Sequence, residues 1–388
     1  MSVFYPFFIF LILFSGAFFL AIKSFQILNY LVLLVVILIT IISTLKNNIK
    51  YKHNAFIYWQ LALIVFSAVH SFYFANVTTT IFFYMINVFV VCSIILVAPS
   101  TNSFYSDICK CSIYILLLFV IISCASLFLG VETKRFSSFF DNANTYSMNL
   151  VFISFFSMCF FIESVLVKKN TYFVSLTILY SFCLYFIILS GSRKTLIFYI
   201  ALFLYWLFIN KRILLSFVQN RFIKLCTQVL IIYTFLTALL WFYNSPFAKR
   251  IVGAIAFLSK GTSEEGSINE RLNLLSKGIE LWSSAPIFGV GFDGFRNLSG
   301  FGKYSHNNFI EILANTGVIG SFLYYCFILF LFISIVLFKG QREIKYILLL
   351  MFSGLLFFDL TIVSYNNIFF ILTYGFIFHR IYNFGGRK

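Results

Sequence analysis

Long apolar runs recur from one end of the chain to the other, and they limit its possible folds more than any other feature. A helix of about 20 apolar residues crosses the ~30 Å hydrocarbon core of a bilayer. Within lipid every backbone amide must be paired inside the protein, so spanning segments are helices or closed barrels. These runs are continuous and do not alternate in polarity, which argues against a barrel. We therefore expect an all-α, polytopic integral membrane helical bundle.

The overall composition agrees with a membrane protein. Hydrophobic residues make up 61% of the chain and charged residues 10%, against roughly a quarter charged in soluble domains. The first run lacks a basic start and a small-residue cleavage site, so we expect a span and not a removed signal peptide. The runs predict about 12 transmembrane helices. These lie at 3–22, 26–44, 55–73, 79–98, 111–130, 146–166, 171–189, 195–209, 225–243, 317–338, 346–361 and 364–379.

Basic residues in the short connections indicate the orientation of the chain. Most Lys and Arg fall in connections on one side of this layout, which the positive-inside rule assigns to the cytoplasm together with both termini. We expect a multi-pass protein of the bacterial cytoplasmic (inner) membrane with one large extracytoplasmic (periplasmic) loop. The expected parts are transmembrane helices 1–9 over 1–243 with outward loops at 131–145 and 190–194, the large loop at 244–316, and helices 10–12 over 317–388.

The large loop is expected to carry short amphipathic helices. Ser267 and Glu270 have the spacing of a capping box, after which apolar residues recur at helical intervals. This helix is expected to lie against the bilayer. Its apolar residues are Leu272, Leu275, Ile279 and Trp282. A Pro- and Gly-rich stretch at 285–295 predicts a tight turn, Ser305 is the expected N-cap of the next segment, and 315–317 predict a bend.

A group of polar residues follows the turn, where the large loop meets an apolar run. His306 can exchange a proton near neutral pH, because the ordinary pKa of histidine is about 6.5. Asn307 and Glu311 are possible supporting residues, although neither shares the helical face of His306 by the usual i+3 or i+4 spacing. The alternative for His306 is a hydrogen-bonded structural residue. His70, near the outer end of the third predicted span, is expected to be a packing residue, with membership of the site as the alternative.

Several arginines lie on the outward side, against the positive-inside trend. A single basic residue there is commonly a lipid-headgroup anchor, but a guanidinium also offers paired donors that match phosphate oxygens. Arg193 is the most specific, because it lies in SGSRK, where one span ends and a helix N-terminus adds positive potential. The arginines form a candidate anion site as a group. They are Arg135, Arg193, Arg250, Arg271 and Arg296.

Other classes of chemistry have no motif in the sequence. There is no P-loop, GxSxG elbow, HExxH or outward DxD-like acidic pair, which argues against ATP use, serine hydrolysis and metal-dependent transfer. The cysteines lie within or beside apolar runs, and we expect packing roles with no disulfide, metal or other cofactor. They are Cys92, Cys109, Cys111, Cys124, Cys159, Cys183, Cys226 and Cys326. No nucleic-acid partner is expected. What remains is a membrane enzyme with an already activated donor.

Four stretches resemble the signatures of the bacterial O-antigen ligase and polymerase superfamily. The main ones are RLNLLSKGIELWSSAPIFGVGFDGF and, after it, HNNFIEILANTGVIG. The others are SGSRKT at 190–195 and RFSSFFDNANTYS at 135–147, in which Ser138 stands where the family usually has Gly. Together they cover 59 of the 388 residues, and their order matches the predicted topology.

The resemblance implies a membrane glycosyltransferase that uses polyprenyl-diphosphate-linked sugars. His306 would be the catalytic residue, and Arg193 and Arg271 would bind the diphosphate, with Arg135 and Arg296 as weaker candidates. The implied partners are an undecaprenyl-diphosphate-linked oligosaccharide donor and acceptor, the lipid bilayer and a chain-length regulator protein.

Three functions stay open at this point. A polymerase would lengthen a surface polysaccharide such as O-antigen, capsule or exopolysaccharide, and a ligase would transfer the glycan to lipid A-core. We favour the polymerase, because such enzymes serve many glycans and vary widely in sequence. A flippase for lipid-linked oligosaccharides would need polar groups near the middle of the spans, whereas Glu163 and Asp359 lie near span ends.

Overall fold

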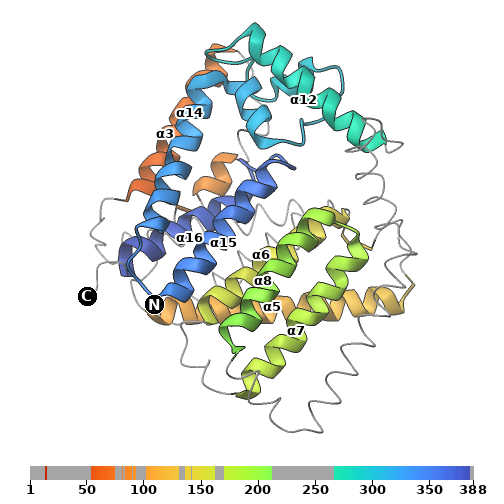
Figure 1. Ribbon diagram of the computed structural model, residues 1–388. Helices are drawn as coiled ribbons and strands as arrows, with labels where there is room; N and C mark the ends of the chain where they lie inside the picture. Colours follow the sequence, from red (N-terminus) through yellow and green to blue (C-terminus); the bar gives the residue numbers. More distant parts are fainter. Residues whose placement is uncertain are drawn as a thin grey trace. The chain divides into compact units, whose positions relative to one another are not determined.

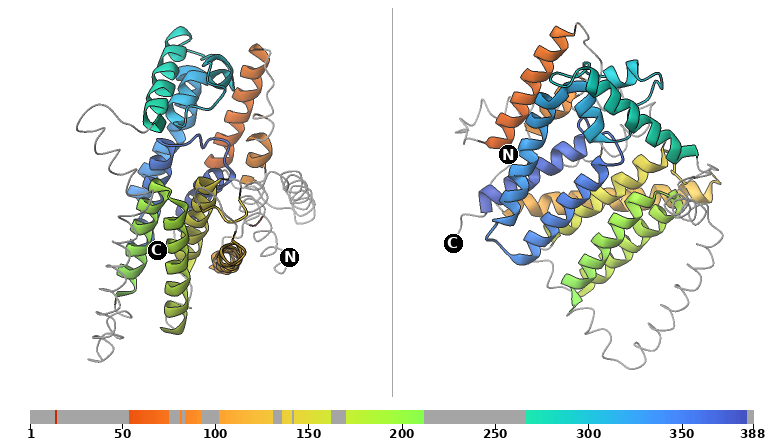
Figure 2. Two further views of the ribbon diagram at one scale, coloured as in Figure 1. Left: turned by 90° about the vertical axis from the view of Figure 1, so that its right-hand side faces the viewer. Right: turned by 45° about the horizontal axis from the view of Figure 1, so that its top comes forward.

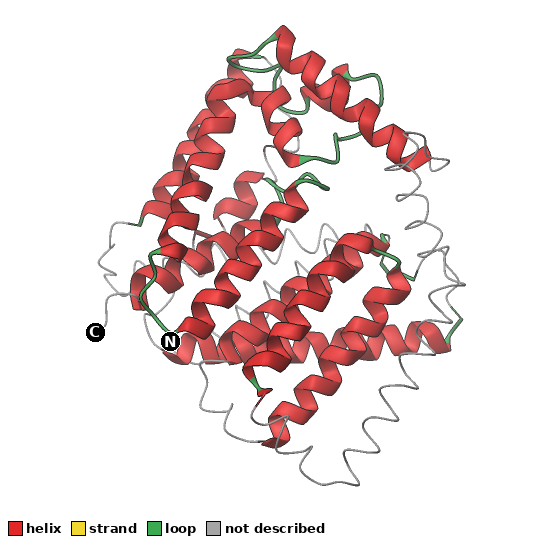
Figure 3. Ribbon diagram, in the orientation of Figure 1, coloured by secondary structure: helices red, strands yellow, loops and turns green. Residues whose placement is uncertain are grey.

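The described residues of the computed structural model are helical, with loops and turns between the helices and no strand among them (Figure 3). These residues are 54–74, 102–130, 136–140, 142–161, 170–211 and 266–384, with short pieces at 14, 81, 84–89 and 91–92. The chain forms two compact units. Unit 1 is Met1–Gln26 with Tyr105–Ile268, and unit 2 is Ile27–Phe104 with Asn269–Lys388.

Unit 1 contains three helices that lie side by side in every view (Figures 1 and 2). They are α6 (Ala143–Phe161), α7 (Asn170–Ser190) and α8 (Arg193–Ile209), preceded by α5 (Asn102–Phe128). Buried hydroxyl groups join them. Tyr180 lies 2.8 Å from the hydroxyl of Ser157, and the Tyr199 hydroxyl donates to the backbone oxygen of Tyr180 over 3.0 Å. Hydrogen bonds between polar side chains of this kind join apolar helices.

Unit 2 is arranged around the long helix α14 (Asn308–Val336), against which three other helices pack. These are α3 (Ala55–Tyr73), α15 (Arg342–Asp359) and α16 (Ile368–Phe384). The Trp59 ring stacks on Phe327 at 4.3 Å, and its indole N–H donates to the Leu323 oxygen over 2.9 Å. Most of α12 (Gly266–Ser284) and the short α13 (Gly294–Leu298) belong to the same unit.

The described helices confirm a helical membrane protein. Four of them are long and apolar enough to cross a bilayer, and these are Ala55–Tyr73, Asp107–Phe128, Phe173–Ser190 and Asn308–Val336. The predicted span at 55–73 coincides with α3. The predicted spans at 3–22, 26–44 and 225–243, and most of 79–98, fall outside the described residues, so the total of about 12 is not confirmed.

Candidate active site

The helix α14 breaks its regular hydrogen bonding at Gly317, where the backbone has φ 63° and ψ −164°. The break leaves backbone carbonyl and amide groups on either side without partners in the helix, and the turn at 286–291 forms hydrogen bonds with them. Four backbone bonds result: Val290 N–H to Ala314 O (2.9 Å), Gly291 N–H to Asn315 O (2.9 Å), Val318 N–H to Pro286 O (2.9 Å) and Ile319 N–H to Ile287 O (3.3 Å). The bend predicted at 315–317 is confirmed, and it lies inside a helix that begins at Asn308, earlier than the predicted span.

Two glycines allow this close approach of one backbone to the other. Gly289 and Gly317 both have positive φ, and a side-chain carbon on either would collide with the opposite backbone. At Gly289 the obstructing atoms belong to Asn315 and Thr316, and at Gly317 they belong to Ile287 and Phe288. The Pro-Gly turn and the Asn-Thr-Gly bend, which look separate in the sequence, are therefore two halves of one contact. 

Asn315 and Glu311 extend this contact to the residue before His306. The Asn315 side chain accepts the Phe295 N–H over 2.7 Å, which fixes the start of α13, and its amide donates to Glu311 over 3.1 Å. The other oxygen of Glu311 accepts the Ser305 N–H over 2.7 Å. Glu311 is fully buried, so its carboxylate acts here as a structural acceptor and does not face the surface.

His306 itself is exposed and has φ 57°, an uncommon conformation for a residue with a side chain. The chain must adopt it because Ser305 is bound to Glu311 and the helix starts directly afterwards. Asn307 is the N-cap of α14, and its side chain accepts the Ile310 N–H over 3.1 Å. The prediction of Ser305 as the N-cap was wrong. Its hydroxyl instead donates to the Asn307 oxygen over 2.7 Å, which tightens the turn around His306.

Glu270 of α12 interacts with several positive groups of unit 2. Lys303 donates to its carboxylate over 2.6 Å, and His306 and Arg271 also act on it electrostatically. The hydrogen bond and charge of Lys303 are the main reasons that the pKa of Glu270 lies below its ordinary value. Two predicted site residues, His306 and Arg271, therefore influence the same carboxylate, while Lys303 is the residue that contacts it. The predicted capping box was wrong, since Ser267 lies inside α12.

Arg296, on α13, is engaged with its own loop. Its Nε–H donates to the Gly302 oxygen over 3.4 Å, and the guanidinium lies over the Tyr304 ring, 5.4 Å from its centre. Since the side chain is exposed and neither contact uses all of its donors, an anion could still bind to it.

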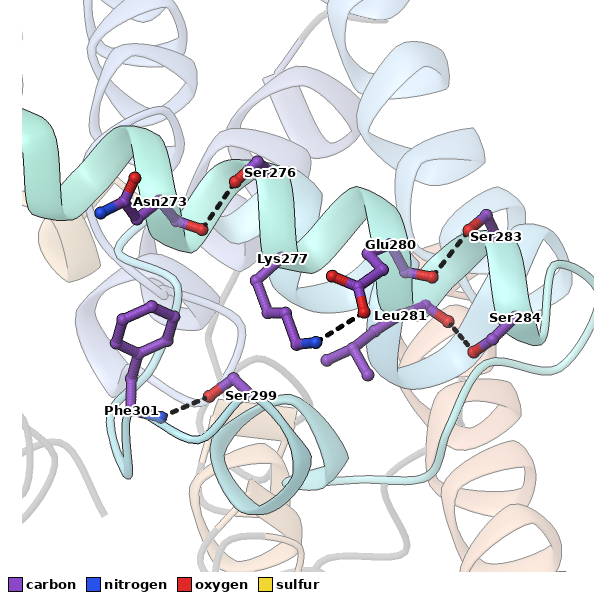
Figure 4. A network of polar contacts seen from close by, with 9 residues as sticks. All are labelled: Asn273, Ser276, Lys277, Glu280, Leu281, Ser283, Ser284, Ser299 and Phe301. Carbon is purple, nitrogen blue, oxygen red and sulfur yellow. Dashed lines mark hydrogen bonds and ion pairs between the residues drawn. The ribbon is translucent and has the colours of Figure 1, made fainter.

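The predicted amphipathic helix is α12, but it packs through a different set of residues (Figure 4). Leu274 is fully buried against Phe295 and Ala314, and Leu281 packs beside them. In Figure 4, Leu281 and Lys277 point toward the side on which Ser299 and Phe301 lie. The predicted apolar residues are half-buried or exposed: Leu272 (46%), Leu275 (38%), Ile279 (45%) and Trp282. Their contact with a bilayer stays a prediction.

A second polar cluster, which the sequence did not indicate, anchors the start of α14 from the other side. The Asn308 side chain accepts the N–H groups of Ser364 (3.0 Å) and Tyr365 (3.2 Å) and donates to Tyr325 OH over 3.2 Å. The fully buried Asp359 carboxylate accepts the Ser364 hydroxyl. The only signal in the sequence was that Asn308 directly follows the His-Asn pair. Asp359, predicted merely to end a span, is part of this support.

His70 is bound to the turn that faces the bend of α14. Its Nε2–H donates to the Phe288 oxygen over 2.7 Å, and its ring lies among the rings of Phe66, Phe74 and Phe292. The histidine therefore ties α3 to the turn, in agreement with the packing role expected for it.

The remaining motifs lie at one end of unit 1. Arg193 is the first residue of α8, and Thr195 beside it donates to the Ser147 hydroxyl near the start of α6 over 3.1 Å. The loop 136–140 reaches the same end, because Phe136 packs on Tyr146 with ring centres 5.7 Å apart. Arg135 and Arg250 lie outside the described residues.

Arg271, Arg296, His306, Asn307 and Glu311 therefore belong to unit 2, and Arg193 belongs to unit 1. Within the described part of the chain, no group of three or more His, Cys, Asp or Glu residues could hold a metal ion. Six of the cysteines form no disulfide within the described part of the chain, namely Cys92, Cys109, Cys111, Cys124, Cys183 and Cys326.

The part of the chain that carries these residues matches a known protein family. The family model described as O-antigen ligase matches residues 178–325. This part of the chain is an O-antigen ligase family domain. The O-antigen ligase family domain includes Arg193, Arg271 and His306, and members of the family transfer lipid-linked glycans. The search among curated proteins found no match.

The two glycines at the α14 bend should be far more sensitive than other glycines with positive φ. Gly317→Ala and Gly289→Ala should each lower the free energy of unfolding by several kcal/mol, because the methyl group adds a collision to the ~1–2 kcal/mol of the left-handed backbone. Gly300→Ala is the matched control, since it has φ 80° and open space around it. Thermal unfolding in detergent measures the difference, and equal losses at all three positions would contradict the described contact.

Replacement of Ser138 by glycine should raise the stability of the protein. It has φ 53° and its buried hydroxyl has no hydrogen-bond partner among the described residues. Ser138→Gly should therefore raise stability by up to about 1 kcal/mol. The control is Ser137→Gly, which lacks positive φ and should be neutral or destabilising. A melting temperature that falls in Ser138→Gly as much as in the control would show that the left-handed turn is not strained.

Proposed function

We propose that the protein polymerises undecaprenyl-diphosphate-linked oligosaccharide repeat units into a surface polysaccharide, on the extracytoplasmic side of the bacterial cytoplasmic membrane. The observation that carries this proposal is the placement of His306. It is exposed on a fixed turn within the O-antigen ligase family domain, and it acts electrostatically on Glu270, as Arg271 also does. A base next to a phosphate-binding guanidinium is what glycosyl transfer from a diphosphate needs.

In the proposed reaction His306 acts as the general base. It takes the proton of an acceptor sugar hydroxyl, whose oxygen attacks the anomeric carbon of the donor. The bond from that carbon to the diphosphate oxygen breaks, and undecaprenyl diphosphate leaves with the electron pair. Base catalysis of this kind contributes about 10²–10⁴ in rate.

Arginines would stabilise the charge that develops on the leaving diphosphate. Arg271 and Arg193 have this role in the proposal, with Arg296 and Arg135 as weaker candidates. Asn307 and Glu311 are positioning residues, since Asn307 caps the helix after His306 and Glu311 holds the amide before it. The positive charge of the arginines would make a metal ion unnecessary for this step.

Ligation to lipid A-core is the second candidate, because the matching family model is described as O-antigen ligase. The two reactions share donor, base and leaving group and differ in the acceptor alone. Incubation with the lipid-linked repeat unit in the absence of lipid A separates them, since only a polymerase lengthens chains there.

The variant His306→Asn tests the proposal. Asparagine tolerates positive φ better than most residues, so the turn should be kept while the base is lost. We expect the initial rate of chain elongation to fall by about 10²-fold or more, with an unchanged melting temperature. Asn273→Ala, exposed on α12, is the control and should keep the rate. Near-normal polymer length with His306→Asn at matched abundance would remove His306 from the mechanism.

A further inference from the structure

The N-terminus of α8 lacks the side-chain bond that usually closes a helix start. Ser192 is the N-cap residue, and a serine there normally accepts a backbone N–H from the second or third helical residue. Ser192 makes no such bond. The residue is only 3% exposed, and its buried hydroxyl has no hydrogen-bond partner among the described residues.

The neighbouring hydroxyl groups are all engaged, which sets Ser192 apart. Ser190 donates to the Ile187 oxygen over 2.7 Å and accepts the Ser192 N–H over 3.4 Å. Thr195 contacts the Ser192 oxygen over 2.9 Å and the Ser147 hydroxyl over 3.1 Å. A buried hydroxyl without a partner costs about 1–3 kcal/mol. The Ser192 hydroxyl is thus a hydrogen-bond donor without an acceptor, next to the Ser190 and Thr195 hydroxyls, which already have acceptors.

The electrostatic surroundings indicate what that donor would bind. Ser192 stands at the positive end of a 17-residue helix, where backbone N–H groups favour anions. Arg193 follows directly as the first helical residue. A hydroxyl donor, a helix N-terminus and a guanidinium at consecutive positions suit an oxygen anion such as a phosphate group.

We propose that the Ser192 hydroxyl donates a hydrogen bond to a phosphate oxygen of the donor's diphosphate, at the N-terminus of α8. This inference rests on the proposed function and adds a residue to its binding site. No bond to the serine oxygen is made or broken. Ser192 would bind the leaving group and keep it in place as charge builds up on it.

The test uses a substitution that separates capping from anion binding. Aspartate is as good an N-cap as serine, so Ser192→Asp should preserve or raise the melting temperature. Its charge would repel a phosphate, so the affinity for inorganic pyrophosphate and the transfer rate should both fall by about ten- to a hundredfold. Ser192→Thr keeps the hydroxyl and should retain both. Gln341→Asp is the matched control, because Gln341 is also an N-cap without a side-chain bond and should tolerate the charge.

Arg193→Lys distinguishes failure of this inference from failure of the proposed function. If Ser192→Asp keeps both affinity and rate while Arg193→Lys loses them, the serine is only a local cap and the inference is overturned. If both variants keep affinity and rate, the anion site does not lie at α8, and the role of Arg193 in the proposed function falls as well. Loss in Ser192→Asp, with Ser192→Thr and Gln341→Asp unaffected, supports the inference.

Discussion

The backbone contact between the turn at 286–291 and the bend of α14 at 314–319 is the constraint on which the His306 end of unit 2 depends. A helix broken within an apolar segment leaves amides and carbonyls that must find partners. Here they find one another across two glycines, and the contact in turn places Asn315. Asn315 fixes α13 and Glu311, Glu311 fixes Ser305, and the chain then has to present His306 with a left-handed backbone.

Charge near His306 is arranged differently from this buried framework. Lys303 and Arg271 lie around the exposed Glu270 carboxylate, and exposed ion pairs contribute little to stability. Because the pKa of Glu270 is lowered, its favourable contribution is present above the ordinary carboxylate range and is lost as the pH falls through the folded value. In the proposed function a diphosphate would compete with Glu270 for these cations, while the rigid backbone would hold His306 in position as the base.

The sequence predicted the helical membrane class, the limits of α3 and the bend at Gly317, because apolar runs and glycine carry those features locally. It misplaced the start of α14 and the N-cap, because Asn307 and Ser305 are equally good local candidates and only the buried Glu311 carboxylate, which binds the Ser305 N–H, decides between them. The packing face of α12 was also missed, since Leu274 and Leu281 recur at a helical interval just as the predicted residues do, and only Phe295 and Ala314 select between the two faces. Contacts that form only in the folded chain decided both.

The central claim is that arginines and one histidine suffice for glycan polymerisation from a diphosphate-linked donor. The most direct measurement is chain elongation by the purified protein in liposomes, with the undecaprenyl-diphosphate-linked repeat unit as sole substrate, in EDTA and without nucleotide or lipid A. The expected result is a ladder of longer lipid-linked chains. Absence of the ladder until a nucleotide or a divalent metal is added would contradict the claim.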